Sequence, residues 1–417
     1  MVDQRTFVIV GGGLAGAMAA QTLRDQAFDG RIVLLCEEPV RPYERPPLSK
    51  DWLRGDEGEG PWVHDEDWYA AHDVELRLGA EVGALDVTVR TVTLAAGETI
   101  GWDAVLLATG AAPVVPPIPG VDRGGVHVLR TIADAGRLRA AITPGVRVAV
   151  VGAGWIGSEV AASARQIGAE VTLIEQAAVP LERVLGAEVG AVYAALHADH
   201  GVHMRMSARV ERIDGAEAAE AVVLADGEQV PADVVVVAVG VRPRVAFAQA
   251  AGLAVDDGVL VDEGLRASAP GVYAAGDVAN AWHPLLGRRV RVEHWANAKN
   301  QGIAAARSML GEAVSYDRLP YFYSDQYDLG MEYSGHAARW DEVVFRGDVA
   351  ARAFVVFWLD GGRVVAGMNA NVWDVVEPIQ ALVRSGRPVD PARLEDGPMS
   401  LEDLAAQAGA GASDTGD

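Results

Sequence analysis

A glycine pattern that occurs twice constrains this chain more than any other feature of its sequence. The first copy, residues 11–16 (GGGLAG), follows the apolar run 6–10 and precedes an Ala-rich stretch typical of a helix. The second copy, residues 152–157 (GAGWIG), follows the run 147–151 about 140 residues later. In each copy the first glycine permits a tight turn, the second lets the backbone approach a pyrophosphate, and the third lets helix pack on strand. The two copies therefore predict two dinucleotide-binding folds.

Each glycine pattern is followed by a second strand-like run with an acidic residue at its end. Glu37 follows the run 31–36, and Glu175 ends the run 171–175 at the place that we take as equivalent. A carboxylate there accepts hydrogen bonds from an adenosine ribose and repels a 2′-phosphate. We therefore expect the second site to prefer NADH to NADPH. The alternatives are an ordinary Gly-rich turn for the first pattern and a solvated strand end for Glu175.

Changes in composition divide the chain into three domains. The Pro-rich segment 111–120 and the segment 240–243 are typical of two crossings between domains, and aromatic-rich strands begin near Pro320. We predict an α/β chain with two Rossmann-like dinucleotide-binding domains and a C-terminal α+β domain. The predicted boundaries are 1–110 with 242–319 for the first domain, 111–241 for the second, 320–405 for the third, and 406–417 for a disordered tail.

Charge and cysteine content exclude several classes of function. The 35 Lys and Arg residues face 58 Asp and Glu residues, and the net charge of −23 argues against nucleic acid and anionic membranes as partners. A single cysteine, Cys36, allows no intrachain disulfide, CxxC redox pair, thiolate zinc site or Cys-ligated iron–sulfur cluster. We expect Cys36 to be buried in its strand. No apolar run approaches the roughly 20 residues that span a bilayer, and we expect a cytoplasmic protein.

Two further features leave alternatives open. Lys50 and Lys299 are the only lysines, and Lys50 ends the stretch 45–50 (RPPLSK), where two prolines release the backbone into a short helix that Ser49 would cap. That setting favours a role for an ammonium point charge, but it is equally compatible with a surface lysine on a loop. The histidines 197, 200 and 203 are three residues apart near a helix end. Histidine is favoured there for other reasons, so we expect no metal site.

The motifs together resemble a known family. The two glycine patterns in this order, with Ala108-Thr109-Gly110 and Gly276-Asp277, resemble the two-dinucleotide flavoprotein reductases of the glutathione-reductase structural class. The stretches 41–50, 292–298 and 324–328 are more narrowly similar to NADH-dependent ferredoxin reductases, close to putidaredoxin and rubredoxin reductases. The resemblance covers about residues 5 to 400. One departure is Phe322-Tyr323, where relatives often have Phe-Trp, and it leaves partner specificity open.

The resemblance implies FAD in the first domain and NADH in the second. The residues that it assigns to FAD are Gly11, Gly13, Ala15, Gly16, Glu37, Arg45, Lys50, Val82, Thr109, Gly110, Arg130, Gly276, Asp277, His294 and Trp295. The residues that it assigns to NADH are Gly152, Gly154, Ile156, Gly157, Glu159, Glu175, Arg183 and Gly240. It further implies that Lys50 pairs with Glu159 against flavin N5 as the catalytic pair, and that Trp295 and the helix after it cover the pyrimidine end of the flavin.

The activity implied is that of a ferredoxin–NAD(+) reductase. Hydride passes from NADH to FAD, and single electrons then pass to a small [2Fe–2S] ferredoxin or a rubredoxin that serves a cytochrome P450 or a ring-hydroxylating oxygenase. Because a second cysteine is lacking, electrons must leave the flavin without a protein thiol. An NADH oxidase that reduces O₂ and a redox-sensing binding protein similar to apoptosis-inducing flavoproteins are the alternatives. We expect an acidic ferredoxin to dock at the basic cluster 288–291 (RRVR), or otherwise around residues 321–327.

Overall fold

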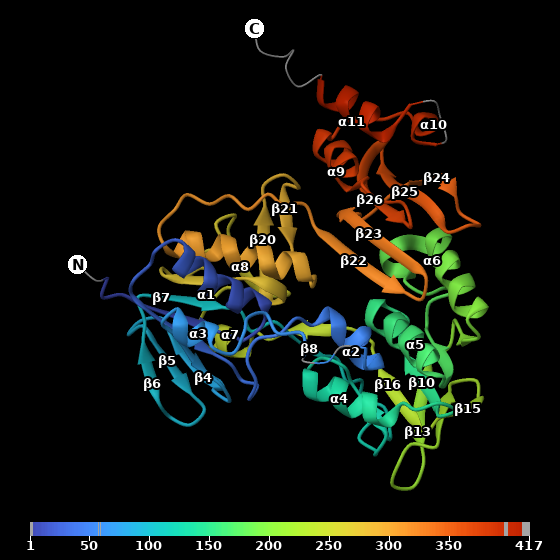
Figure 1. Cartoon of the computed structure of the whole chain (residues 1–417), viewed down its shortest axis with the longest axis horizontal. Helices are drawn as coiled ribbons and strands as arrows, with labels where there is room; N and C mark the ends of the chain where they lie inside the picture. The colour runs from blue at the N-terminus through green and yellow to red at the C-terminus, as the bar shows by residue number, and fades with distance from the viewer. Residues whose placement is uncertain (1–2, 57, 59, 396–398, 411–417) are drawn as a thin grey trace. The chain divides into compact units, whose positions relative to one another are not determined.

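The computed structural model describes residues 3–56, 58, 60–395 and 399–410 (Figure 1). The chain forms two compact units. Unit 1 consists of residues 1–46, 57–112 and 241–318, and unit 2 consists of residues 47–56, 113–240 and 319–417. The segment 47–56, which we had assigned to the first domain, therefore folds with unit 2. The predicted second and third domains lie together in unit 2.

Unit 1 is built on a five-stranded parallel sheet with the order β19-β7-β1-β2-β3. A small antiparallel sheet, β4-β5-β6, accompanies it, and so does a mixed sheet in which β18 pairs in parallel with β20 of the hairpin β20-β21. Its elements are β1 (Thr6–Val10), α1 (Leu14–Asp25), β2 (Arg31–Leu35), α3 (Trp68–Ala71), β3 (Val74–Arg77), β4 (Val82–Asp86), β5 (Thr91–Leu94), β6 (Thr99–Gly101), β7 (Ala104–Leu107), β17 (Val241–Pro243), α7 (Ala246–Ala250), β18 (Val259–Val261), β19 (Val272–Ala274), the 3₁₀ turn η2 (Gly276–Val278), β20 (Ala279–His283), β21 (Arg288–Val290) and α8 (Trp295–Met309). The turn η1 (Pro46–Ser49) and the strand β8 (Ala111–Pro113) span the boundaries between the units.

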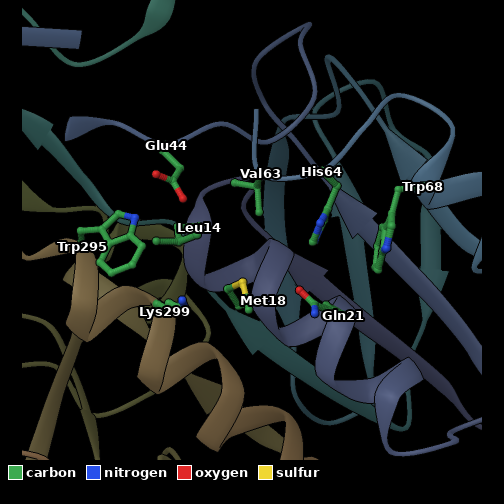
Figure 2. Close-up of a pocket in the computed structure, with 9 residues that line it drawn as sticks. All are labelled: Leu14, Met18, Gln21, Glu44, Val63, His64, Trp68, Trp295 and Lys299. Atoms are coloured by element: carbon green, nitrogen blue, oxygen red, sulfur yellow. The ribbon is translucent and has the colours of Figure 1, made fainter. Parts of the chain in front are cut away.

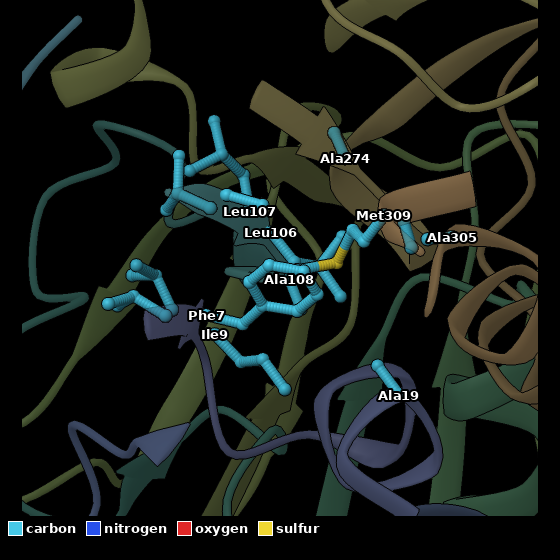
Figure 3. Close-up of a cluster of buried hydrophobic side chains, with 14 of the residues drawn as sticks. Phe7, Ile9, Ala19, Leu106, Leu107, Ala108, Ala274, Ala305 and Met309 are labelled. Carbon is cyan, nitrogen blue, oxygen red and sulfur yellow. The ribbon is translucent and has the colours of Figure 1, made fainter. Parts of the chain in front are cut away.

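The core of unit 1 lies between this sheet and the helices α1 and α8. Figure 3 shows Phe7 and Ile9 of β1 and Leu106 of β7 in a cluster that also contains Ala19 of α1 and Met309 of α8. The strands read as continuous apolar runs because a parallel sheet is covered on both faces. Small residues on α1 and α8 let the two helices pack side by side.

Unit 2 combines a parallel sheet, β12-β11-β10-β16-β9, with an antiparallel sheet, β22-β23-β26-β25-β24. A small antiparallel sheet, β13-β14-β15, follows the first of these. Its elements are α2 (Asp51–Arg54), β9 (Val126–His127), α4 (Ile132–Ala141), β10 (Arg147–Val151), α5 (Trp155–Ile167), β11 (Glu170–Ile174), α6 (Glu182–Asp199), β12 (His203–Arg205), β13 (Val210–Asp214), β14 (Ala221–Leu224), β15 (Gln229–Pro231), β16 (Val234–Val237), β22 (Tyr321–Gln326), β23 (Leu329–Gly335), β24 (Glu342–Asp348), β25 (Ala353–Asp360), β26 (Arg363–Ala370), α9 (Val376–Ser385), α10 (Pro391–Leu394) and α11 (Leu401–Ala410).

A shared core joins the antiparallel sheet of unit 2 to helix α6. Leu185 and Val189 of α6 are fully buried in one cluster with Phe322 of β22 and Trp358 of β25. The indole N–H of Trp358 donates to the carbonyl of Leu185 at 3.1 Å, which ties the antiparallel sheet to α6. The C-terminal sheet therefore packs directly against a helix of the second glycine-loop domain.

The end of the chain differs from the sequence prediction. Helix α11 continues to Ala410, so the predicted disorder is wrong for residues 406–410, and residues 411–417 lie outside the described part of the chain. Leu401 and Leu404 are buried, and α11 packs against α9. Those two leucines supply the apolar contact that we had not credited to this segment. Within the described residues, no helix is long and apolar enough to cross a membrane.

Candidate cofactor sites and the Lys50 cluster

The first glycine loop joins β1 to α1 in unit 1. Gly11 has a φ of +120°, and a Cβ at this position would lie 2.2 Å from the carbonyl oxygen of Ala108. A Cβ on Gly16 would lie 2.1 Å from the carbonyl oxygen of Gly11. A Cβ on Gly13, in contrast, would have no described atom within 4 Å. The loop therefore requires glycine for its own packing and leaves open space directly before the helix.

The start of α1 is suited to an anion. Gly13 is the N-cap residue, and no side chain of the described residues caps the helix. The first turn carries no acidic residue either. Its N–H groups and the positive end of the helix dipole thus face the open space, which is how helix starts bind pyrophosphate. The residues present fit the diphosphate of FAD.

Glu37 has a partner that sequence reasoning missed. Its carboxylate is hydrogen-bonded to the guanidinium of Arg244, 207 residues away in the chain. The backbone of Arg244 is fixed in turn, because its carbonyl accepts from the hydroxyl of Thr109 at 3.1 Å and its N–H donates to the carbonyl of Gly110 at 3.0 Å. The side chains of Arg244 and Glu37 are 44% and 51% exposed, so a ligand can reach both. The predicted residues Thr109 and Gly110 thus position a cation beside the ribose acid.

Several of the remaining FAD candidates of unit 1 lie at or next to the starts of α1 and α8. Gly276 packs against Ala15, since a Cβ on Gly276 would lie 3.2 Å from that of Ala15, and Asp277 follows it. Arg45 forms an ion pair with Glu38 at 3.1 Å, and the charge of Asp277 helps to raise the pKa of Arg45 against the effect of burial. The other candidates are His294, the N-cap residue of α8, Trp295, its first residue, and Val82, the first residue of β4. Arg130, in unit 2, precedes the N-cap residue of α4.

A groove of about 340 Å³ follows the outer side of α1 and α8 (Figure 2). Leu14 and Trp295, which begin the two helices, lie at one end. At the other end the ring of His64 stacks on Trp68 with centroids 3.9 Å apart. The residues that line the groove are Leu14, Met18, Gln21, Glu44, Val63, His64, Trp68, Trp295 and Lys299. The groove thus opens beside the helix start that the first glycine loop leaves free.

The second glycine loop, in unit 2, repeats the geometry of the first. Gly152 has a φ of +101°, and a Cβ there would lie 2.4 Å from the carbonyl oxygen of Ala238. A Cβ on Gly157 would lie 1.9 Å from the carbonyl oxygen of Gly152. Gly154 is the N-cap residue of α5, whose first turn carries neither an acid nor, in the described chain, a capping side chain. This loop also fits a dinucleotide diphosphate.

Glu175 is held by the backbone around it. One carboxylate oxygen accepts from the N–H of Ala153 at 2.7 Å. The other accepts from Gln176 at 2.7 Å and from Ala177 at 3.0 Å. The carboxylate is therefore oriented toward the glycine loop before any ligand binds, as a ribose acid must be. Of the other NADH candidates, Ile156 is exposed in the first turn of α5, Arg183 lies in the first turn of α6, and Gly240 follows β16.

The register of the two sheets corrects one prediction. The last pairs before the loops are Val10 with Leu35 and Val151 with Ile174. The next residue on the second strand is Cys36 in one sheet and Glu175 in the other. Glu37 lies one residue further, so the equivalence that we assigned to Glu37 and Glu175 is wrong by one position.

Lys50 and Glu159 meet in unit 2. Nζ of Lys50 lies 3.5 Å from Oε1 of Glu159, and the two side chains are 9% and 7% exposed. Lys50 occupies the N-cap position of α2, so Ser49 does not cap this helix as we had expected. The hydroxyl of Ser49 donates instead to Oε2 of Glu159 at 2.5 Å. The interpretation of Lys50 as a loop lysine at the surface is wrong, and its place against the flavin stays a prediction.

The C-terminal sheet adds three residues to this cluster. Ser324 of β22 donates to Oε1 of Glu159 at 2.7 Å. Oδ2 of Asp325 lies 4.0 Å from Nζ of Lys50, and the ring centroid of Tyr323 lies 4.8 Å from it. Ser324 and Asp325 belong to the stretch 324–328 that marked the family resemblance, but nothing in their order indicated contact with residue 50 or 159.

The basic cluster 288–291 is less positive than its sequence suggests. Arg291 forms an ion pair with Asp257 at 3.1 Å and a second with Glu293. The guanidinium of Arg289 donates to two backbone carbonyls, those of Val261 and Asn280. Much of the charge that we assigned to docking is therefore used to hold the hairpin β20-β21 against its neighbours.

Two of the remaining titratable candidates, Cys36 and His197, are buried, whereas His200 is half-buried and His203 is exposed. Burial raises the pKa of Cys36 to about 12, which keeps its thiol protonated. Burial lowers the pKa of His197 to about 4, and its Nδ1 lies 3.3 Å from the hydroxyl of Tyr327, whose ring stacks on His200. In the part of the chain that is described, no group of three or more His, Cys, Asp or Glu residues is arranged to hold a metal ion.

Comparison with known proteins bears on this arrangement. Residues 5–302 match the model of the pyridine nucleotide-disulphide oxidoreductases, and residues 321–405 match the model of the C-terminal reductase domain. The chain belongs to the pyridine nucleotide-disulphide oxidoreductase family. Its two glycine loops lie within the first match, and its C-terminal sheet lies within the second.

Relatives and solved structures match almost the whole chain. The ferredoxin–NAD(+) reductase component of the anthranilate 1,2-dioxygenase system of Burkholderia cepacia is 43% identical over 95% of this chain and 98% of its own length. Putidaredoxin reductase of Pseudomonas putida is 35% identical over 96% of this chain and 97% of its own. Putidaredoxin reductase in its covalent complex with putidaredoxin superimposes with a TM-score of 0.92 at 34% identity, covering 97% of this chain and 99% of that one.

Proposed function

We propose that this chain is a ferredoxin–NAD(+) reductase, which takes hydride from NADH and delivers single electrons to a small iron–sulfur protein of an oxygenase or cytochrome P450 system. The observation that carries the proposal is the presence of two open, uncapped glycine-loop helix starts in a chain whose one thiol is buried. Two dinucleotides can bind, and Cys36 cannot relay electrons between them as a thiolate. The names of the relatives and of the solved complex support the choice of acceptor.

When bound, FAD accepts a hydride and gives up its electrons one at a time. The first glycine loop would hold its diphosphate, and Glu37 would accept hydrogen bonds from its ribose hydroxyls. The second loop binds the diphosphate of NADH. Glu175 accepts the ribose hydroxyls there, and its charge disfavours the 2′-phosphate of NADPH.

Lys50 and Glu159 act as a pair in this proposal. The carboxylate of Glu159 pairs with the ammonium of Lys50 and holds it in place, because a buried charge requires a partner. An ammonium stabilises the negative charge that develops when a flavin is reduced. Replacing Lys50 by Met is expected to slow flavin reduction by NADH in stopped flow while FAD content stays unchanged. Reduction at the parental rate would contradict this role.

The acceptor is tested with purified protein and NADH in air. We expect slow NADH oxidation that rises several-fold when a [2Fe–2S] ferredoxin from a panel is added, while ferricyanide reduction proceeds without one. Fast oxidation with O₂ alone that no ferredoxin increases would contradict the proposal and favour an NADH oxidase. No turnover with any acceptor would favour a redox-sensing binding protein. A cytoplasmic location remains a prediction from the sequence.

A further inference from the structure

The edge strand β22 presents consecutive residues to the Lys50 cluster from its two faces. Ser324 points inward and is 2% exposed, whereas the side chain of Asp325 is 60% exposed and Tyr323 is also open to solvent. Neighbouring side chains on a strand alternate between faces. Lys50 reaches the edge of the sheet, so its ammonium contacts residues of the outer face while Glu159 contacts the inner one.

Glu159 owes its orientation to two hydroxyl groups. Ser49 donates to Oε2 and Ser324 donates to Oε1, the oxygen that also lies nearest the ammonium of Lys50. Ser49 is itself fixed, because its carbonyl accepts from the hydroxyl of Ser163 at 2.6 Å. A buried carboxylate is stable as an anion when its lone pairs accept hydrogen bonds, and here each oxygen accepts one from a different element.

We propose that Ser324 is a positioning residue for the Lys50–Glu159 pair. Two carboxylates can pair with the ammonium of Lys50: the buried one of Glu159 and the exposed one of Asp325, whose Oδ2 lies 4.0 Å from Nζ. By fixing Oε1 of Glu159, Ser324 favours the buried pair. The C-terminal domain thereby sets the geometry of the pair, in addition to any part it takes in docking. The consequence for flavin reduction rests on the proposed function, but the positioning itself does not.

The groups that face this pair come from each element packed around it. Lys50 faces Glu159 of α5 and the side chains of Tyr323 and Asp325 of β22. From α6, the fully buried Tyr193 lies near enough to Glu159 that the carboxylate adds to burial in raising its pKa. The hydroxyl of Tyr193 has no hydrogen-bond partner among the described residues, so it does not substitute for Ser324.

Removing the hydroxyl of Ser324 should release Oε1 and let the ammonium move toward exposed Asp325. The chain offers a direct measurement, because Lys50 and Lys299 are its only lysines. Holoenzyme is treated with trace acetic anhydride at one pH, and the acetylation of the two lysines is compared by mass spectrometry. Lys299 serves as the internal reference in every variant.

We expect Ser324→Ala to raise the Lys50 to Lys299 labelling ratio at least threefold. Ser324→Thr, which keeps the hydroxyl, should restore a near-parental ratio. Ser334→Ala is the matched control, because Ser334 is a buried serine of the same sheet whose hydroxyl accepts from Gln380 at 3.3 Å and does not contact Glu159. An unchanged ratio in Ser324→Ala, or an equal rise in Ser334→Ala, would overturn the proposal.

Stopped-flow reduction by NADH then distinguishes the positioning role of Ser324 from the catalytic role of the Lys50–Glu159 pair. Ser324→Ala should slow reduction several-fold with an unchanged KM for NADH, and it should have no further effect in a Glu159→Gln background. A raised labelling ratio with parental reduction would support the positioning and contradict the catalytic role of the pair. Additive effects of the two substitutions would overturn positioning through Glu159.

Discussion

The two glycine loops share their backbone and differ in how their ribose acids are held. In both, a Cβ on the first glycine would meet the carbonyl oxygen of the residue that follows a neighbouring strand, Ala108 in one and Ala238 in the other. Glu175, however, is bound by three N–H groups within its own βαβ unit, whereas Glu37 is bound by the guanidinium of Arg244. Local structure thus orients Glu175, which we predict to contact NADH, and tertiary structure orients Glu37, which we predict to contact FAD.

A single residue of register explains much of this difference. Glu175 occupies the position directly after its strand, and its carboxylate accepts a hydrogen bond from the N–H of Ala153 in the glycine loop. Cys36 occupies that position in unit 1, and its Sγ lies so close to the loop that a Cβ on Gly12 would be 2.3 Å from it. Glu37 lies one residue later, and its carboxylate is bound by Arg244. In the second site the acid is therefore held by residues of its own βαβ unit, whereas in the first site it is held by a residue from a distant segment.

The largest test of the comparison is Gly11→Ala beside Gly152→Ala. Each alanine would adopt a strained positive φ and clash with a carbonyl oxygen, so each loop should deform. Gly11→Ala is expected to purify without FAD. Gly152→Ala should purify yellow and be reduced by dithionite, but its kcat/KM for NADH should fall at least a hundredfold. Loss of FAD from both variants in absorbance spectra would mean that the two sites are not separable.

The second test concerns the carboxylate of Glu175. The parent should use NADH at least tenfold better than NADPH in kcat/KM. Glu175→Gln removes the charge that repels a 2′-phosphate and leaves the N–H of Ala153 facing an amide, so the preference should fall by about tenfold, or about 1.4 kcal/mol. Glu37→Gln, assayed with excess FAD, should leave the preference unchanged. An undiminished preference in Glu175→Gln would show that other residues select the nucleotide.

The sequence predicted the local features of the two sites but not the contacts between distant segments. The glycine loops, their helices and the burial of Cys36 follow from residue order, because strand and helix periodicity are local properties. The contact of Lys50 with Glu159 came from the resemblance, and the structure confirms it. Arg244, Ser324 and Asp325 were missed because their roles depend on which segments the fold brings together.

The errors have equally specific causes. A basic run predicts positive charge, but Arg291 forms ion pairs with Asp257 and Glu293. Asp257 is distant in the sequence, just before β18. Ser49 before a short helix is a typical N-cap, yet its hydroxyl donates to a buried carboxylate, which gains more from a charge-assisted bond. In both cases a distant acid changed the role that local pattern assigned.

A smaller effect is expected from Arg244→Ala. The ion pair with Glu37 is about half exposed, and such pairs contribute at most about 1 kcal/mol. We therefore expect the Kd for FAD, measured by fluorescence titration of apoprotein, to rise measurably, but by no more than about fivefold. Arg242→Ala removes an exposed arginine two residues earlier on β17 and should not change it. Equal values for parent and Arg244→Ala would mean that Glu37, like Glu175, needs no distant partner.

The smallest effect is predicted for the thiol of Cys36, which stands where the second loop has Glu175. Because burial raises its pKa to about 12, only about one molecule in ten thousand carries the thiolate at pH 8, and the reactive fraction grows tenfold with each pH unit until that value is approached. Native protein should therefore resist iodoacetamide at pH 8, and one cysteine per chain should react once the protein is unfolded in guanidinium chloride. Fast alkylation of the native protein would show that the thiol is accessible. The close packing of Sγ against Gly12, which leaves Glu37 one residue beyond the position that Glu175 occupies in the second loop, would then be wrong.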